Sequence, residues 1–182
     1  VPALANMALE LTKMLGVGIL GNCLKNIICG AATVFPNLVA GYDKLGIKLS
    51  AGYGLTESSN LVSGNPLTLE KPTSVGLLYP NQEYKIVDGE LLLKGDNIMT
   101  EYLENPEDTN KAFSDGYFRT GDLVKFDEDG FLYIVGRCKN ILILDNGENV
   151  SPEIIENKLD NNPLILGSMA YEGVNDRGIN CI

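Results

Sequence analysis

Histidine is absent from all 182 residues of this sequence. Its absence excludes catalysis by a Ser-His-Asp or a Cys-His arrangement. Cysteine is scarce, because Cys23, Cys29, Cys138 and Cys181 are the only four, and none belongs to a Cys-x-x-Cys pair. The pattern argues against a zinc site of the usual Cys/His kind. We interpret the cysteines as small, buried apolar side chains in a reducing compartment.

Basic residues are also few. The sequence has 14 Lys and Arg against 24 Asp and Glu, and its net charge is -10. Nucleic-acid binding needs a basic surface, so we expect no nucleic-acid partner. A small anionic ligand needs only a few local donors and stays possible.

Long apolar runs are missing as well. None approaches the ~20 residues of a membrane helix, and no signal peptide opens the chain. We therefore expect no transmembrane segment and a cytoplasmic location, with peripheral lipid contact left open. The chain begins at Val1 and ends abruptly at Ile182, so we expect a piece of a longer polypeptide.

The first third alternates between helix and strand patterns. Residues 3–15 carry apolar side chains at helical spacing, which predicts an amphipathic helix. The apolar run 26–29 suits a buried strand. A second helix is predicted over 35–45, ended by Gly46, and a short strand over 47–49. This order indicates an α/β layer.

After about residue 75 the pattern becomes β-rich. Asp-Gly is a strong hairpin turn, because glycine accepts a positive φ. The predicted strands are 83–87, 90–94, 122–126, 131–135 and 141–144, with turns at Asp88-Gly89, Asp129-Gly130 and Asn146-Gly147.

Two further helices have clear starts. Asn105 precedes Pro106 and two acidic residues, which is typical of a capped helix N-terminus. Ser151 and Pro152 repeat the arrangement and open a helix to about residue 159. The predicted fold class is α/β with α+β character. An α/β layer segment and a β-rich hairpin subdomain would form a large-domain part, residues 1–136, followed by the start of a small α+β domain, residues 137–182.

One glycine motif is misleading. Residues 16–21 match Gly-x-Gly-x-x-Gly, but a dinucleotide site needs that motif between a strand and a helix. Here a predicted helix precedes it. We interpret the segment as a helix terminator and turn.

Residues 51–57, Ala-Gly-Tyr-Gly-Leu-Thr-Glu, form the first cluster with chemical potential. Two glycines would let the backbone approach a flat ligand on which Tyr53 stacks. Thr56 can hydrogen-bond a phosphate, and Glu57 can hold magnesium. A glycine-rich turn with a solvated Glu57 is an equally good interpretation of these residue types.

Two more clusters follow. In Tyr-Phe-Arg-Thr-Gly-Asp, Asp122 on a tight glycine turn can accept two ribose hydroxyls. The alternative is a surface ion pair of Asp122 with Arg119, worth little energetically. From Gly136 onward, Arg137 and Lys139 can meet phosphate or ribose oxygens, or they form a solvated basic pair at a strand end.

In this order, the three clusters resemble the adenylate-forming superfamily, which includes acyl- and aryl-CoA synthetases, adenylation domains of peptide synthetases, and beetle luciferases. The resemblance runs from about residue 24 to residue 160. The Asn-Gly loop within 144–153 resembles fatty-acyl-CoA synthetases more than peptide-synthetase domains.

The resemblance implies a role for each candidate residue. It implies that Thr56 contacts the α-phosphate, that Glu57 is the magnesium ligand, and that Lys139 is the hinge between two domain orientations. The loop 147–150 would move to the active site for thioester formation. The residues implied to bind the nucleotide are Gly30, Ala31 and Ala32 at the adenine pocket, Gly52, Tyr53 and Gly54 at the stacking position, Asp122 at the ribose, and Arg137 at the domain junction.

The implied parent enzyme uses ATP, Mg²⁺ and coenzyme A to convert a carboxylic acid, expected to be a fatty acid, to acyl-AMP and then acyl-CoA. The family's phosphate-loop lysine and its late catalytic lysine are expected before residue 1 and after residue 182, so we expect the isolated chain to be inactive. Cys29 and Glu101 depart from the family's usual glycines, which bears on the acyl pocket.

Two other functions stay open. An adenylation domain that loads a carrier protein has the same motifs, and a non-catalytic nucleotide-binding module needs neither lysine. We also expect exposed apolar surface near residues 3–28, which invites self-association.

Overall fold

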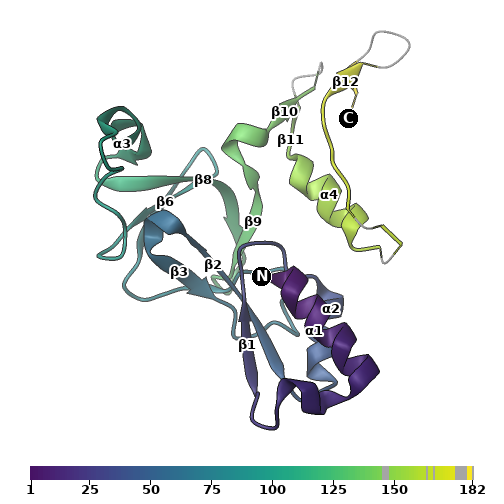
Figure 1. Cartoon of the computed structure of the whole chain (residues 1–182). Coiled ribbons are helices and arrows are strands. Elements are labelled where there is room, and N and C mark those ends of the chain that lie inside the picture. Colours follow the sequence, from purple (N-terminus) through teal and green to yellow (C-terminus); the bar gives the residue numbers. More distant parts are fainter. Residues whose placement is uncertain (145–147, 163, 166, 175–179, 182) are drawn as a thin grey trace.

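The computed structural model describes residues 1–182 except 145–147, 163, 166, 175–179 and 182 (Figure 1). Its first sheet begins with β1 (Asn26–Cys29) and β2 (Lys48–Leu55), which pair in parallel. The predicted strand–helix–strand unit is therefore confirmed. The sheet continues antiparallel through β3 (Asn60–Gly64) and β4 (Leu77–Leu78).

Two helices lie together on one side of β1 and β2 (Figure 1). They are α1 (Pro2–Leu15) and α2 (Pro36–Asp43), as the apolar spacing predicts. The hydroxyl of Tyr42, fully buried, donates to the backbone oxygen of Ala5 at 2.6 Å and joins the two helices. The core beneath them contains Leu9, Val34, Leu38, Val39, Ile47, Leu49 and Ala51.

The second sheet is antiparallel and has the order β5-β6-β8-β7, and β9 also pairs with β8. Positive φ angles at Asp88 (51°) and Gly89 (83°) form the predicted hairpin turn between β5 and β6. Helix α3 (Pro106–Ala112) follows Asn105, whose Oδ1 accepts from the Asp108 backbone N at 3.1 Å, so that cap is confirmed. The strands are β5 (Glu83–Val87), β6 (Glu90–Lys94), β7 (Phe113–Ser114), β8 (Tyr117–Phe126) and β9 (Leu132–Arg137).

A second apolar cluster joins the two sheets. Val62 of β3 packs with Leu91 and Leu93 of β6, Val124 of β8 and Leu132 of β9. Because side chains from both sheets share this cluster, the end of β2 is held against β8.

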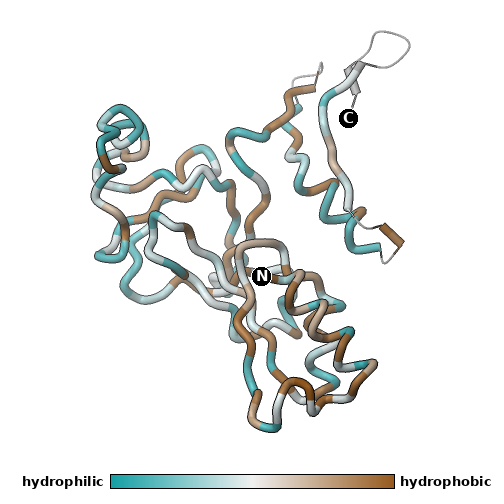
Figure 2. The backbone as a smooth tube through the Cα atoms, in the orientation of Figure 1, coloured by the Kyte–Doolittle hydropathy of each residue, from teal (hydrophilic) through white to brown (hydrophobic). Residues whose placement is uncertain are grey.

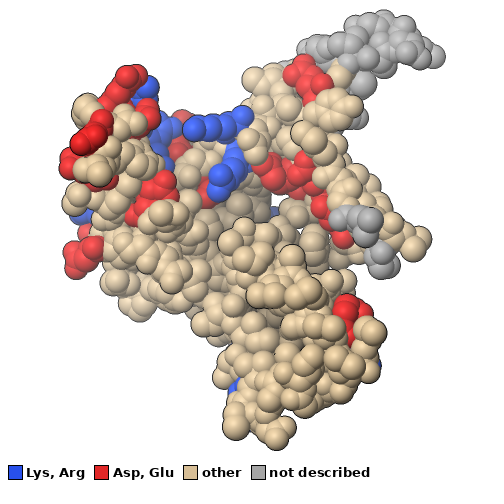
Figure 3. Space-filling model, viewed as in Figure 1, with Lys and Arg blue, Asp and Glu red and all other residues tan. Residues whose placement is uncertain are grey.

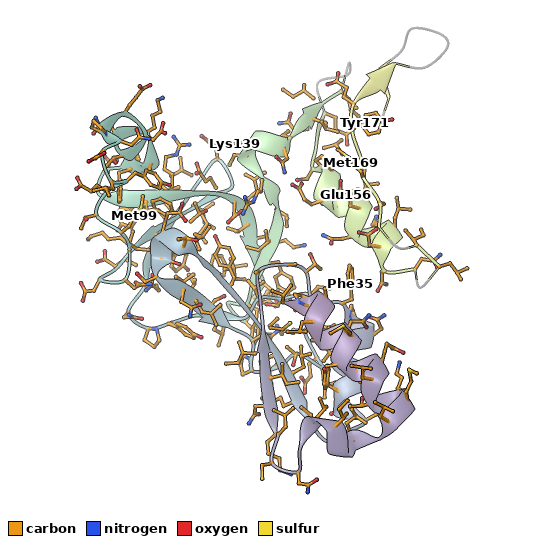
Figure 4. The ribbon with its side chains drawn as sticks, viewed as in Figure 1. Phe35, Met99, Lys139, Glu156, Met169 and Tyr171 are labelled. Atoms are coloured by element: carbon orange, nitrogen blue, oxygen red, sulfur yellow. The ribbon has the colours of Figure 1, made fainter. Side chains whose placement is uncertain are left out.

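The C-terminal part packs on β9 through α4 (Pro152–Asp160). Glu156 of α4, labelled in Figure 4, accepts from the Ala170 backbone N at 2.9 Å and so holds the following segment. The remaining elements are the pairs β10 (Leu142–Ile143) with β11 (Asn149–Val150) and β12 (Gly173–Val174) with β13 (Asn180–Cys181), and the 3-10 helices η1 (Val17–Leu20), η2 (Thr56–Ser58) and η3 (Cys138–Asn140).

Three local predictions are wrong. Strand β2 extends to Leu55 rather than ending at 49, because β3 supplies it with a second partner. Cys23 is exposed, whereas Cys29 is buried as expected and Cys138 half-buried. The Ser151 hydroxyl does not cap the backbone of α4 and donates to the Glu153 carboxylate instead, at 3.1 Å.

The glycine motif at 16–21 behaves as predicted. Gly16, with φ 88°, ends α1, and η1 follows before any strand. The expected apolar surface is also present, as Figure 2 shows along α1 and the turn after it. Its exposed side chains include Leu4, Met7, Met14, Leu15, Val17, Ile19 and Ile28. Within the described residues, no helix is both long and apolar enough to cross a membrane.

Candidate functional site

The first cluster lies on the last part of β2. The glycines there are needed by the neighbouring strand, because a Cβ on Gly54 would lie 1.9 Å from the Asn60 backbone oxygen of β3. A Cβ on Gly52 would likewise lie 3.1 Å from the Ser63 oxygen. The interpretation of this segment as a glycine-rich turn is therefore wrong. Tyr53 sits between the two glycines on a paired strand.

Asp122 is the centre of a buried polar group. Its Oδ2 accepts from the Tyr53 hydroxyl at 2.6 Å, and its Oδ1 pairs with Arg137 Nε at 2.9 Å. Only 2% of the Asp122 side chain is exposed, against 60% for Arg137. The group joins β2, β8 and β9. The hydrogen bond between Tyr53 and Asp122 joins residues that are 69 positions apart in the sequence.

This environment changes the acid–base properties of both hydroxyl and carboxyl. Burial raises the pKa of Asp122, while the Tyr53 hydrogen bond and the Arg137 charge oppose that rise. Burial and the nearby Asp122 raise the pKa of Tyr53, so the phenol stays protonated and donates. An acceptor carboxylate with a buried donor on one oxygen and an exposed guanidinium on the other suits vicinal hydroxyls of a ligand.

The predicted setting of Asp122 needs correction. It lies within β8 and not on a tight turn, and Gly121 beside it, with φ 71°, marks an irregularity in the pairing with β6. Arg119 does not pair with Asp122. It pairs with Glu90 at 2.6 Å, and the other oxygen of Glu90 accepts from the Gly121 backbone N at 3.0 Å. The proposed Arg119–Asp122 surface pair is thus wrong.

The candidate phosphate residues follow β2 on η2. Thr56 is exposed and Glu57 half-buried. Tyr102, from the segment between β6 and α3, donates its hydroxyl to Glu57 Oε1 at 2.9 Å. Burial and Glu57 raise the pKa of Tyr102, which keeps the phenol protonated. Sequence reasoning assigned Tyr102 no function, because nothing in its neighbourhood points to a residue 45 positions away.

One cleft of ≈ 1660 Å³ contains these groups. Phe35 and Lys139, labelled in Figure 4, belong to its lining. Figure 3 shows basic side chains gathered around the hollow between the α3–β8 region and α4. Of the candidate residues, the lining contains Ala31, Ala32, Gly52, Tyr53, Gly54, Thr56, Glu57, Asp122, Arg137 and Lys139.

Two candidates lie elsewhere or cannot be placed. Gly30 is outside the cleft lining, and a Cβ there would lie 2.9 Å from the Gly52 backbone oxygen, so it serves strand packing. Of the loop 147–150, Gly147 lies outside the described residues, and Asn149–Val150 forms β11.

The donor set bears on the expected metal. The described residues contain no group of three or more His, Cys, Asp or Glu side chains that could hold an ion together. Magnesium commonly takes one or two carboxylates and completes its octahedron with water and phosphate oxygens. Glu57, with the Thr56 hydroxyl next to it in an open cleft, fits that kind of site.

Comparison with known proteins finds a matching family model, related sequences and similar solved structures. A family model described as "AMP-binding enzyme" matches residues 1–103. The long-chain-fatty-acid–CoA ligase FadD15 of Mycobacterium bovis is 40% identical over 146 residues, which cover 80% of this chain and 24% of that protein.

Two solved structures are similar over almost the whole chain. Mycobacterium tuberculosis fatty acyl CoA synthetase aligns with a TM-score of 0.73 and 28% identity, over 99% of this chain and 38% of that one. Unliganded O-succinylbenzoate coenzyme A synthetase of Bacillus subtilis aligns with a TM-score of 0.80 and 25% identity, over 98% of this chain and 40% of that one. The chain thus spans well under half the length of these proteins.

Proposed function

This chain belongs to the AMP-binding enzyme family, and from that we propose that it forms the nucleotide-binding part of an AMP-forming acyl-CoA synthetase. The parent enzyme would activate a carboxylic acid, most simply a fatty acid, as acyl-AMP and pass the acyl group to coenzyme A. The resemblance to long-chain-fatty-acid–CoA ligases over four fifths of the chain supports this substrate class.

The observation that carries the proposal is the convergence of Tyr53, Asp122 and Arg137 in the same cleft as Thr56 and Glu57. In the first step, a carboxylate oxygen of the acid attacks the α-phosphorus of ATP, and the bond to the bridging oxygen of pyrophosphate breaks. In the second, the thiol of coenzyme A loses its proton and its sulfur attacks the acyl carbon, the bond from that carbon to the phosphate oxygen breaks, and AMP leaves. The first step moves no proton and needs alignment and charge neutralisation.

Each residue has a part in this scheme. The Tyr53 ring stacks on adenine, Asp122 accepts from the ribose hydroxyls, and Arg137 gives up part of its contact with Asp122 to reach the nucleotide. Thr56 donates to the α-phosphate. Glu57 would hold Mg²⁺, which lowers the negative charge that the attacking carboxylate meets.

The domain organisation belongs to the same proposal. Residues 1–136 would be the large-domain part, and 137–182 the start of a mobile small domain that turns about Lys139. Lys139 lies in η3, directly after β9, and is exposed. A cytoplasmic location of the parent enzyme is part of the same proposal.

Binding and turnover test the proposal separately. Calorimetry of the 182-residue chain with AMP should give measurable but weak binding, because phosphate contacts are few in this part of the protein. The matched segment of the Mycobacterium bovis ligase can then be replaced by this chain. Pyrophosphate release driven by fatty acids supports the proposal, and release driven by amino acids supports a carrier-loading domain instead. AMP binding without turnover of any acid would favour the non-catalytic module.

A further inference from the structure

The segment between β6 and α3 crosses over η2 and holds its backbone. The Met99 backbone N donates to the backbone oxygen of Glu57 at 2.7 Å, and Asn97 Nδ2 donates to the backbone oxygen of Ser58 at 2.9 Å. Figure 4 labels Met99 in this segment. The backbone that carries Glu57 is therefore fixed by a part of the chain about forty residues away.

The same segment contains Tyr102, whose own position is fixed. Its backbone N donates to Thr109 Oγ1 at 2.9 Å, and that hydroxyl donates to the backbone oxygen of Asn105 at 2.8 Å. The first turn of α3 therefore anchors Tyr102. Its hydroxyl reaches Glu57 Oε1 at 2.9 Å from inside the cleft lining.

We propose that Tyr102 is a positioning residue, which holds the Glu57 carboxylate so that its second oxygen faces a metal–nucleotide ligand. Among the described residues, no donor contacts Glu57 Oε2, whereas Oε1 is occupied by the Tyr102 hydroxyl. A carboxylate with one oxygen tied down presents the other as a single ligand in a fixed direction. Magnesium requires nearly ideal octahedral geometry, so this direction determines its affinity. The inference rests on the function proposed above.

Loss of such an outer contact typically lowers metal affinity about 10-fold to 100-fold. The test is calorimetry of the 182-residue chain with ATP, with and without MgCl₂. We expect Mg²⁺ to strengthen ATP binding by the unchanged chain. Tyr102→Phe should reduce the Mg²⁺-dependent gain in ATP affinity about 10-fold. Its AMP affinity without metal should stay within about twofold of that of the unchanged chain. The ring, and with it the packing of the segment, is retained in this variant.

Tyr133→Phe is the matched control. Its hydroxyl also donates to a carboxylate, Asp127 Oδ2 at 3.1 Å, but Tyr133 is outside the cleft lining. It should leave both the metal-free and the Mg²⁺-dependent affinity unchanged. An equal effect of the two substitutions would overturn the inference.

A double-substitution cycle separates positioning from general loosening. If Tyr102 acts through Glu57, adding Tyr102→Phe to Glu57→Gln has no further effect on Mg²⁺-dependent binding, whereas independent effects would add. Additive losses, or a Tyr102→Phe variant with unaltered Mg²⁺ dependence, would overturn the inference while AMP binding leaves the proposed function standing. Absence of AMP binding by the unchanged chain would overturn both.

Discussion

Two aspartates five residues apart, one within β8 and one directly after it, use the same side chain in different ways. Asp122, in the middle of β8, is buried in the cleft, and burial raises its pKa. Asp127 follows the end of β8, outside the cleft, and the hydrogen bond from Lys71 lowers its pKa to about 2. The charged carboxylate of Asp122 lowers the stability of the fold, whereas the charged carboxylate of Asp127 increases it. A charged group kept where it costs stability is typical of a binding site.

Replacing each aspartate with asparagine gives the largest expected difference. Asp122→Asn should weaken AMP binding about 10-fold to 100-fold, because hydrogen bonds to a charged group are worth roughly 1.5–3 kcal/mol. It should not lower the free energy of unfolding at pH 7. Calorimetry and urea unfolding measure the two quantities.

Asp127→Asn is expected to do the reverse, with AMP affinity within about twofold and a lower free energy of unfolding. The comparison fails if both variants lose affinity equally, since the role of Asp122 would then be structural.

A smaller effect is expected at the partner of Asp122. Tyr53→Phe keeps the ring for stacking but removes the hydrogen bond to Asp122. It should cost about 1 kcal/mol of stability, the usual value of one hydrogen bond, and only a few-fold in AMP affinity. Tyr53→Leu also removes the aromatic face and should lose more affinity at a similar stability. Equal AMP affinity of the two variants would rule out stacking.

The pH dependence of unfolding should show the smallest difference. Because the folded pKa of Asp127 lies below its ordinary value of 3.8, its contribution is present above about pH 4 and lost as the pH falls toward 2. Asp122 has the opposite sign: its raised folded pKa favours the folded state at low pH, and that advantage is lost as the pH rises through the folded value. In urea unfolding at several pH values, Asp127→Asn should therefore reduce the fall in the free energy of unfolding between pH 4 and pH 2. An unchanged slope would mean that Lys71 and Asp127 do not interact in solution.

The same contrast separates what the sequence predicts from what it does not. Local signals gave correct results: the Asp88-Gly89 turn, the Asn105 cap and the helix predicted over 3–15 depend on neighbouring residues. The resemblance to the adenylate-forming superfamily is confirmed, because it rests on motifs kept in order along the chain. The site roles, the domain boundary at 137 and self-association of the apolar face of α1 stay predictions.

The misses at the candidate site depend on distant partners. The length of β2 is set by β3, which leaves no room for a side chain at Gly54. The partners of Arg119 and Asp122 come from β6, β2 and β9. Tyr102 was assigned no role, because its contact with Glu57 joins residues 45 positions apart in the chain.

Gly136 of β9 carries a consequence for the proposed rotation about Lys139. A Cβ there would lie 1.6 Å from the Ser151 hydroxyl oxygen, so α4 rests directly on this glycine. Glu153, near the start of α4, also accepts from Asn140 Nδ2 at 2.5 Å. The proposed pivot at Lys139 and the contact of Ser151 with Gly136 would therefore be separate positions. A bulky residue at 136 would change which orientation is more populated, whereas a stiffer residue at 139 would change how fast the two orientations exchange.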